Sequence, residues 1–320
     1  MPDIVCFGEA LIDFHAETLA EGPPRFVQYA GGAPANVAVA VARLGGRAAY
    51  VGMLGRDMFA DFLLREFEEA GVDTHYIVRT GEANTGLAFV ALDEDGERRF
   101  SFYRPPAADL LFRPAHFDVA CFDSLAVFHA CSNSLTEAAI ADTTLDGMQR
   151  ARRAGALVSF DMNLRPALWP QDADARPRVW AALHEADLVK LCREELAFLA
   201  EPSGGEEAVL NRLWQGATRL VVVTDGAAPI RWFTRERQGS TEIYNVRAIN
   251  TNAAGDAFVG GLLLQLAERR VGTDGLAAFA TDDTRLRFAA ACGALAVTRH
   301  GAFSAMPMLD EVRALMASNA

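Results

Sequence analysis

Short apolar runs alternate with helix-like stretches along most of the chain. Six runs rich in branched or aromatic residues are typical of buried strands, and they lie at 3–8, 48–54, 127–131, 156–161, 188–191 and 219–226. Stretches with helical spacing lie among them, at 35–45, 58–71, 135–155 and around 193–200. This order predicts an α/β fold with a mostly parallel central sheet flanked by helices on both faces. In such folds ligands gather at the carboxyl ends of the strands.

Two stretches depart from this alternation. The patterns of residues 13–32 and 84–104 predict extended, hairpin-like segments, and the second would turn at Asp95-Gly96. We expect them, at about 12–30 and 84–106, to pair as a small separate sheet that forms a lid over the main one. The sequence holds no internal repeat and no low-complexity linker, so residues 1–320 are predicted to form a single domain.

The acidic balance of the chain restricts its partners. Its 320 residues are 51% hydrophobic and carry a formal charge of −12, which suits a soluble protein with a large core. Nucleic acid or an anionic membrane would repel it, because no basic patch is concentrated enough to compensate. The longest charge-free run, residues 26–42, contains Gly31, Gly32 and Pro34 and is a poor membrane helix. The N-terminus lacks a signal-peptide pattern and the five cysteines are scattered, so we expect a cytoplasmic protein.

Residues 250–261, NTNAAGDAFVGG, place three small residues and one carboxylate ahead of an apolar helix. A chain that leaves a strand around 244–249 and enters this helix would point unpaired N–H groups forward, where the helix dipole favours an anion. Ala253, Ala254 and Gly255 would let phosphate oxygens approach the backbone, and Gly255 would permit dihedrals that a larger residue resists. Asp256 is either an ordinary N-terminal helix residue or a general base toward a hydroxyl.

A second glycine-rich stretch, AGGAPANVAVAVARLGG at residues 30–46, combines a Gly-Gly turn with a helix entered through Pro34. Asn36 is the one polar residue in an otherwise apolar helix start. Taken alone, Gly31-Gly32 could be a plain turn and Asn36 a helix cap. The combination with the phosphate-binding stretch favours a role in a shared site.

These two stretches resemble the two signature regions of the ribokinase-like (PfkB) carbohydrate kinase family. Segments most similar to those of its fructokinases continue in order: GLAFVALDEDGERRFSFYRPPAADLL, SFDMNLRPALWP and VKLCREELAFL. The resemblance implies a three-layer α/β fold with a small β-sheet lid. It also implies transfer of the γ-phosphoryl group of ATP, with Mg²⁺, to a primary hydroxyl of a sugar, and the fructokinase segments make fructose the expected acceptor. The alternatives are a kinase for 2-keto-3-deoxygluconate, ribose or a nucleoside, or a non-catalytic sugar-binding protein on the same scaffold.

The resemblance also implies roles for individual residues. Asp256 would take the proton from the attacking hydroxyl while the backbone N–H groups of residues 253–255 hold the developing charge. The sugar contacts it implies are Asp13, Gly31, Gly32, Asn36, Phe102, Arg104 and Arg165. The side chains among these residues also have ordinary structural alternatives. Asp13 could be a strand-end turn residue and Phe102 a core aromatic residue. Arg104 and Arg165 could each be a surface ion-pair partner.

The nucleotide and the metal have their own implied residues. Thr224, Asp225 and Gly226 belong to a segment similar to the family's nucleotide loop, and residues 291–303, with Ala291 and Ala294, resemble the adenine-side wall. Glu195 matches the glutamate of the family's Asn-x-x-Glu motif, which organises Mg²⁺ through water. Cys192 replaces the asparagine of that motif, and a solvated glutamate at a helix start is the alternative for Glu195.

Three replacements bear on monovalent cations. Asn250 and Asn252 stand where the family usually has Asp and Thr, and Ala305 stands where some relatives place a serine ligand. Because that aspartate helps bind an activating cation in relatives, activation of this chain by K⁺ is left open.

Aromatic positions around residues 100–103 would pack against another subunit's lid, which predicts a homodimer.

The sequence lacks the motifs of several other chemistries. The six histidines lack the close spacing of a zinc site, and neither a G-x-S-x-G elbow nor a P-loop is present. The first strand ends in FGEALID rather than G-x-G-x-x-G, which disfavours a dinucleotide oxidoreductase.

Overall fold

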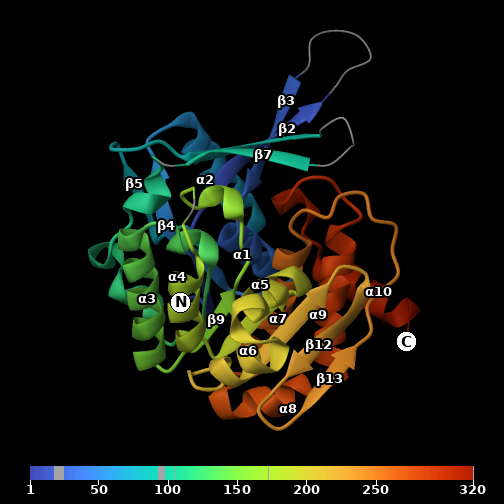
Figure 1. Ribbon diagram of the computed structural model, residues 1–320. Helices are drawn as coiled ribbons and strands as arrows, with labels where there is room; N and C mark the ends of the chain where they lie inside the picture. Colours follow the sequence, from blue (N-terminus) through green and yellow to red (C-terminus); the bar gives the residue numbers. More distant parts are fainter. Residues whose placement is uncertain (18–24, 93–97, 105, 172, 320) are drawn as a thin grey trace.

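The computed structural model describes residues 1–17, 25–92, 98–104, 106–171 and 173–319 (Figure 1). In that part of the chain, a large sheet has the strand order β13-β12-β11-β10-β9-β8-β1-β4-β5. The strands from β11 to β5 run parallel, and β12 and β13 continue the sheet in antiparallel fashion at one edge. The predicted mostly parallel sheet flanked by helices is therefore confirmed.

All six apolar runs identified in the sequence form parallel strands. The parallel strands are β1 Ile4–Phe7, β4 Ala48–Gly55, β5 Ile77–Thr80, β8 Val127–Cys131, β9 Leu157–Asp161, β10 Leu188–Cys192 and β11 Leu220–Asp225. No pattern in the sequence predicted β5 or the antiparallel pair, β12 Ala228–Phe233 and β13 Gln238–Thr241. Every residue of β1, β4, β8 and β9 is buried, because helices cover both faces of the sheet.

The strand predicted around residues 244–249 is wrong. These residues follow an irregular path between β13 and the next helix. The backbone N–H groups of Ile249 and Asn250 both donate to the carbonyl of Val297, at 2.7 and 3.0 Å, rather than to a neighbouring strand. The segment therefore approaches the following helix from a loop and not from the sheet.

The helices divide between two apolar cores, one on each face of the large sheet. Alternate residues of β1 show the division, since Ile4 and Cys6 join one core while Val5 and Phe7 join the other. The first core takes α1 Ala33–Arg43, α2 Met58–Ala70, α7 Ala254–Glu268, α8 Leu276–Ala280, α9 Asp283–Ala296 and α10 Leu309–Ser318. The second takes α3 Ala138–Arg153, α4 Arg176–Glu185, α5 Arg193–Ser203 and α6 Glu206–Leu213.

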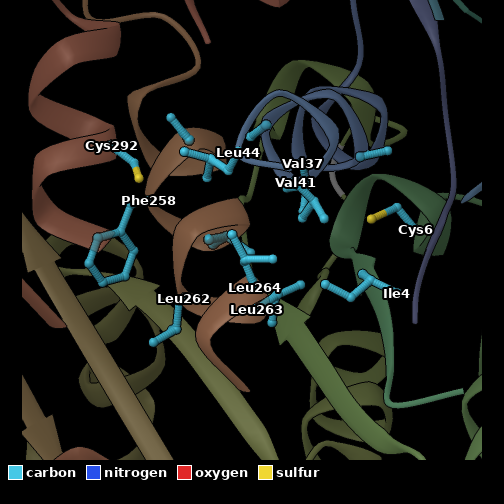
Figure 2. Close-up of a cluster of buried hydrophobic side chains, with 14 of the residues drawn as sticks. Ile4, Cys6, Val37, Val41, Leu44, Phe258, Leu262, Leu263, Leu264 and Cys292 are labelled. Carbon is cyan, nitrogen blue, oxygen red and sulfur yellow. The ribbon is translucent and has the colours of Figure 1, made fainter. Parts of the chain in front are cut away.

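Helices α1 and α7 pack directly against each other beneath the site. Figure 2 shows Val37 and Val41 of α1 facing Leu263 and Leu264 of α7. Both helices are buried along most of their length, as expected of helices that are apolar all round. A Cβ added at Gly260 would lie 2.5 Å from the Cβ of Ala40, so the missing side chain lets the two helices approach closely.

A second, smaller sheet has the order β3-β2-β6-β7 and lies beyond one end of the large sheet (Figure 1). Its strands are β2 Leu11–Glu17, β3 Arg25–Gly31, β6 Gly86–Leu92 and β7 Arg98–Tyr103. This sheet matches the segments predicted to pair at 12–30 and 84–106. The turn predicted at Asp95-Gly96 falls outside the described residues, as do residues 18–24.

None of the helices in the described ranges is both long enough and apolar enough to cross a bilayer.

Candidate active site

Charged side chains meet at the carboxyl ends of the parallel strands. Asp161 ends β9, and Lys190 lies beside it in register on the neighbouring strand β10. The Nζ atom of Lys190 lies 3.1 Å from an oxygen of Asp161, and both side chains are buried. Burial raises the pKa of Asp161 to about 6, although the ammonium group of Lys190 opposes the shift. Neither residue was singled out from the sequence.

Asp256 lies in the first turn of α7 and is buried. Its Oδ2 accepts a hydrogen bond of 2.7 Å from Nδ2 of Asn36, in the first turns of α1. Burial raises the pKa of Asp256 to about 7, the Asn36 hydrogen bond opposes this, and the charge of Asp161 adds to it. Two residues from the two signature stretches are thus joined directly, 220 positions apart in the chain.

The start of α7 has the backbone shape of an anion site, but the strained residue is not the expected one. Ala253 has φ 58° and ψ 8°, a left-handed conformation that residues other than glycine seldom adopt. A left-handed residue followed by helical ones turns successive N–H groups into one concavity. Gly255 lies inside the helix and is not among the residues with positive φ. What Gly255 supplies is space, since a Cβ there would lie 3.2 Å from Nζ of Lys190.

Asp13 lies on the small sheet and faces the same site. It is buried, and a Cβ added at Gly31 would collide with its carboxylate. Burial raises the pKa of Asp13 to about 7, with further contributions from the charges of Asp256 and Glu9, while Arg165 opposes the shift. The charge of Asp256 acts on Asp13, which indicates that both carboxylates face one site.

Gly32 makes the close turn that the Gly-Gly motif predicted. It caps α1 with φ 107°, and a Cβ there would meet the backbone of Glu9 and Ala10. Only glycine fits this position without strain.

Arg165 and Phe102 lie at the edge of the site. Arg165 is exposed, and its positive charge opposes the raised pKa values of Asp13, Asp161 and Asp256. Phe102 shares a register row with Asp13 and Ala88, so its side chain leaves the small sheet on the same face as Asp13. It is half-buried and packs against the second apolar core, which suits the core role weighed for it.

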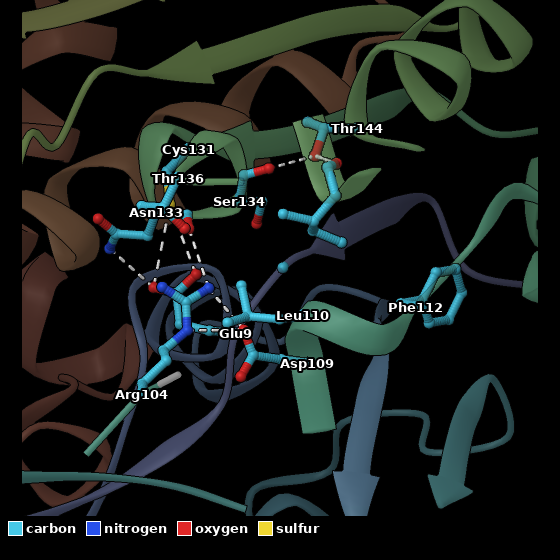
Figure 3. Close-up of polar contacts among 12 residues, drawn as sticks. Glu9, Arg104, Asp109, Leu110, Phe112, Cys131, Asn133, Ser134, Thr136 and Thr144 are labelled. Atoms are coloured by element: carbon cyan, nitrogen blue, oxygen red, sulfur yellow. Dashed lines mark hydrogen bonds and ion pairs between the residues drawn. The ribbon is translucent and has the colours of Figure 1, made fainter. Parts of the chain in front are cut away.

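Arg104 belongs to a buried polar cluster, so the surface alternative for it is wrong (Figure 3). Its Nε and Nη2 donate to Oδ2 of Asp109 at 2.8 and 2.5 Å, and Nη2 also donates to the carbonyl of Asn133 at 2.9 Å. Glu9 extends the cluster, because its Oε1 accepts from Nδ2 of Asn133 and from the backbone N–H of Ala33.

Several polar atoms of this cluster have no hydrogen-bond partner within the described residues. They are Nη1 of Arg104, Oδ1 of Asp109, Oδ1 of Asn133 and Oδ1 of the nearby Asn36. Buried polar atoms are nearly always satisfied by protein, water or ligand. These atoms are therefore candidates to bind the hydroxyl groups of a small polar molecule.

Glu195 is buried and links two strand ends, so it is not a solvated glutamate. Its Oε2 accepts from the backbone N–H of Cys192 at 2.7 Å, and its Oε1 accepts from that of Leu164 at 2.8 Å. Within the described residues, no group of three or more His, Cys, Asp and Glu side chains could hold a metal ion. One or two carboxylates here still suit Mg²⁺, which keeps several waters and takes its other ligands from phosphate oxygens.

The expected nucleotide residues come from the end of β11 and from α9. Thr224 and Asp225 end β11, Gly226 follows with φ 51°, and Asp225 pairs with Arg193 at 3.3 Å. Ala294 of α9 is half-buried, whereas Ala291 is fully buried in the first core. The side chain of Ala291 therefore serves packing rather than contact with a ligand.

Asn250 takes part in the loop that leads into α7. It is buried, and its Oδ1 accepts from the backbone N–H of Asn252 at 2.9 Å. Ala305, also buried, follows Ser304 in a short helical turn. Position 250 thus presents an amide group and position 305 a methyl group.

Comparison with known proteins agrees with this geometry. The family model described as pfkB family carbohydrate kinase matches residues 1–309. Fructokinase-1 of Oryza sativa subsp. japonica is 42% identical over 319 residues, which cover 98% of each chain. The crystal structure of fructokinase with bound ATP from Xylella fastidiosa has a TM-score of 0.95 at 55% identity, covering 100% of this chain and 99% of that one.

A third similar protein is fructokinase from Vibrio cholerae O395, in its fructose, ADP and calcium ion bound form. Its TM-score is 0.85 at 32% identity, covering 98% of this chain and 99% of that chain. The family model spans nearly the whole chain, and these relatives match from end to end. The chain belongs to the pfkB family of carbohydrate kinases.

Proposed function

We propose that this protein transfers the γ-phosphoryl group of ATP to the primary 6-hydroxyl of fructose. One observation carries the proposal above the others. Asp256 is buried at the start of α7, bonded to Asn36 and close to Asp13, so a proton acceptor, an anion-binding backbone and a sugar-side carboxylate share one site. The fructokinases among its relatives support fructose as the acceptor.

In the proposed mechanism, Asp256 accepts the proton of the sugar hydroxyl as that oxygen attacks phosphorus. Its raised pKa suits a base that works near neutral pH. The N–H groups at the start of α7 hold the charge that spreads over the transferred phosphoryl group, which is the main demand of this reaction. Asp13, Gly31, Gly32 and Asn36 orient the sugar so that only one hydroxyl reaches Asp256.

The charge of the polar cluster favours a neutral sugar over a sugar acid. Arg104 is the buried cation of the cluster, and Asp109 already pairs with it through two donors. Glu9 adds a second nearby carboxylate, so no surplus positive charge remains in the cluster to bind a substrate carboxylate. This arrangement disfavours 2-keto-3-deoxygluconate and leaves hydroxyl groups as the groups to be recognised.

We further propose Mg²⁺ as the metal, held through water by Glu195 and by phosphate oxygens. When bound, it neutralises charge on the phosphates of ATP. We expect no requirement for K⁺, because Asn250 and Ala305 offer no charged or hydroxyl ligand. We also propose that the small sheet closes as a lid to exclude water, that two lids pair in a homodimer, and that the protein is cytoplasmic.

The test is a panel of acceptors with Mg·ATP, scored by kcat/KM and run with K⁺ and with Na⁺. Fructose, ribose, 2-keto-3-deoxygluconate and a nucleoside are compared at equal ionic strength. We expect fructose to give the highest kcat/KM. The kcat/KM values measured with K⁺ and with Na⁺ should differ by less than about twofold. A higher kcat/KM for another acceptor would show that fructose is not the preferred substrate. If no acceptor gave ADP, the protein would be a non-catalytic sugar-binding protein.

A further inference from the structure

Lys190 is the only lysine in the chain. The other 29 of its 30 lysine and arginine residues are arginine, including the partner of every other ion pair described above. Lys190 is buried and pairs with Asp161 at 3.1 Å. Arginine would neutralise a buried carboxylate at least as well, because its planar fork can donate two parallel hydrogen bonds. Neutralisation of Asp161 therefore does not explain why this one position holds lysine.

The surroundings of the ammonium group explain it better. Nζ of Lys190 lies 3.2 Å from the point where a Cβ of Gly255 would be, so it faces the first turn of α7. An ammonium group is compact and carries three donors, whereas a guanidinium group is larger and planar. Beside Gly255 only the compact cation fits without displacing the helix start.

The neighbouring carboxylates leave the ammonium group charged and only partly engaged. The charges of Asp161, Glu195 and Asp256 raise the pKa of Lys190 in spite of burial, so it keeps its proton at neutral pH. Both oxygens of Glu195 accept hydrogen bonds from backbone N–H groups, and Oδ2 of Asp256 accepts one from Asn36. Among the described residues, Nζ of Lys190 donates its hydrogen bond to Asp161.

We propose that Lys190 is a catalytic residue that donates a hydrogen bond to the transferred phosphoryl group, and that Asp161 positions it. This inference rests on the proposed function, since it needs the γ-phosphate of ATP at the start of α7. Lys190 keeps its proton throughout and forms no covalent bond. Its fixed positive charge adds to the backbone N–H groups where the transition state is most negative.

The experiment compares the affinities of ADP and of an ATP analogue with a methylene bridge between the β and γ phosphorus, by calorimetry with Mg²⁺. We expect Lys190→Met to weaken binding of the analogue at least about tenfold and binding of ADP less than about threefold. Only the analogue carries the terminal phosphate that Lys190 would contact. With fructose and ATP, kcat should fall at least about 10²-fold while the KM for fructose changes little. Equal losses for both nucleotides would overturn the proposal.

Two further variants keep the test decisive. Lys190→Met with Asp161→Asn removes both charges of the pair, so Asp161 is not left as an unpaired buried carboxylate. This double variant should lose the same discrimination. Arg152→Met is the matched control, because Arg152 pairs at 3.1 Å with the buried Asp187 at the opposite end of β10. It should lose stability but keep the ratio of the two affinities. If the wild type phosphorylates fructose while Lys190→Met keeps its discrimination, this inference fails and the proposed function stands.

Discussion

Asp256 shows how one side chain is adjusted for work near neutral pH. Burial alone would leave a carboxylate protonated well above its ordinary range. The hydrogen bond from Asn36 and the charges of Arg165 and Lys190 oppose burial and hold the pKa at about 7. The side chain is thus ionised in a large fraction of molecules at pH 7 and is still basic enough to accept a proton.

The pH dependence of catalysis follows from this value. Only ionised Asp256 can accept the hydroxyl proton, so kcat/KM for fructose should rise with pH and level off above about 7. Because burial also raises the pKa of Asp13 to about 7, the decline on the acid side should be steeper than that of one group. Initial rates between pH 5.5 and 8.5 at constant ionic strength provide the check. A flat profile across this range would remove Asp256 as the base.

Asp256→Asn should separate catalysis from stability. The amide can still accept from Asn36 but cannot take a proton, so turnover should fall at least about 10²-fold while fructose still binds. In the wild type the folded pKa lies above the unfolded value, so stability is lost as pH rises through about 7. The variant does not show this loss of stability, because asparagine does not titrate. Its gain in unfolding free energy should be larger at pH 8 than at pH 5 by roughly 2 kcal/mol.

Denaturant unfolding of both proteins at the two pH values measures this difference, and calorimetry with fructose measures binding. A variant that is equally destabilised at both pH values would show that Asp256 is not a strained, buried charge.

At the scale of elements, the close packing of α1 and α7 explains why two distant stretches meet. Gly260 lets α7 approach Ala40 of α1, and the two helix starts then lie side by side. Asn36 and Asp256 occupy those starts and bond to each other. The contact between the helices therefore sets the distance between the sugar side and the phosphate side of the site.

Gly255→Ala tests what the small residue contributes to α7. Alanine suits a helix better than glycine, so the substitution should leave stability unchanged or raise it by up to about 1 kcal/mol. The added Cβ would lie 3.2 Å from Nζ of Lys190 and push the ammonium group aside, so kcat should fall about tenfold or more. Gly272→Ala is the control, since a Cβ there meets no atom within 4 Å. Full activity of Gly255→Ala would show that the space is not needed.

Local patterns predicted six of the parallel strands, the segments of the small sheet and the two signature helices, because period and glycine placement are properties of adjacent residues. Asp256 and Asn36 lie in the two glycine-rich stretches, and the resemblance of those stretches to the family's signature regions indicated their roles. Lys190 and Asp161 were missed, since their pairing depends on the register of β10 against β9, which no local pattern specifies. The single lysine in an arginine-rich chain was the one available signal. The error at residues 244–249 arose because a partly apolar loop that leads into a helix has the residue pattern of a strand. Only the structure shows that the backbone there bonds to Val297 and not to a neighbouring strand.

At the scale of the whole molecule, the site is built from two sheets and therefore depends on how they meet. The large sheet supplies Asp161 and Lys190, and the helices beside it supply Asp256 and Asn36. The small sheet supplies Asp13. Because the small sheet has one face toward the site, its other face must be stabilised by packing or by a partner.

That other face carries a group of aromatic side chains. Phe89 contacts Phe14, Phe26 and Tyr103, with ring centroids 5.1, 5.3 and 5.2 Å apart. Tyr103 and Phe26 remain 66% and 52% exposed in the single chain. Exposed aromatic residues that pack together are typical of an interaction surface, and a second copy of the same sheet offers a matching one.

We therefore expect a dimer at micromolar concentration that Tyr103→Asp converts to monomer, because the new charge would be buried against the partner's aromatic residues. Val119→Asp is the matched control, since Val119 is 72% exposed but lies in a short helical turn, Val119–Phe122, outside the small sheet. Sedimentation velocity of the three proteins measures the change. The control should stay dimeric, and fructose turnover in Tyr103→Asp shows whether pairing supports the site. A monomeric wild type, or equal dissociation in both variants, would rule out association through this sheet.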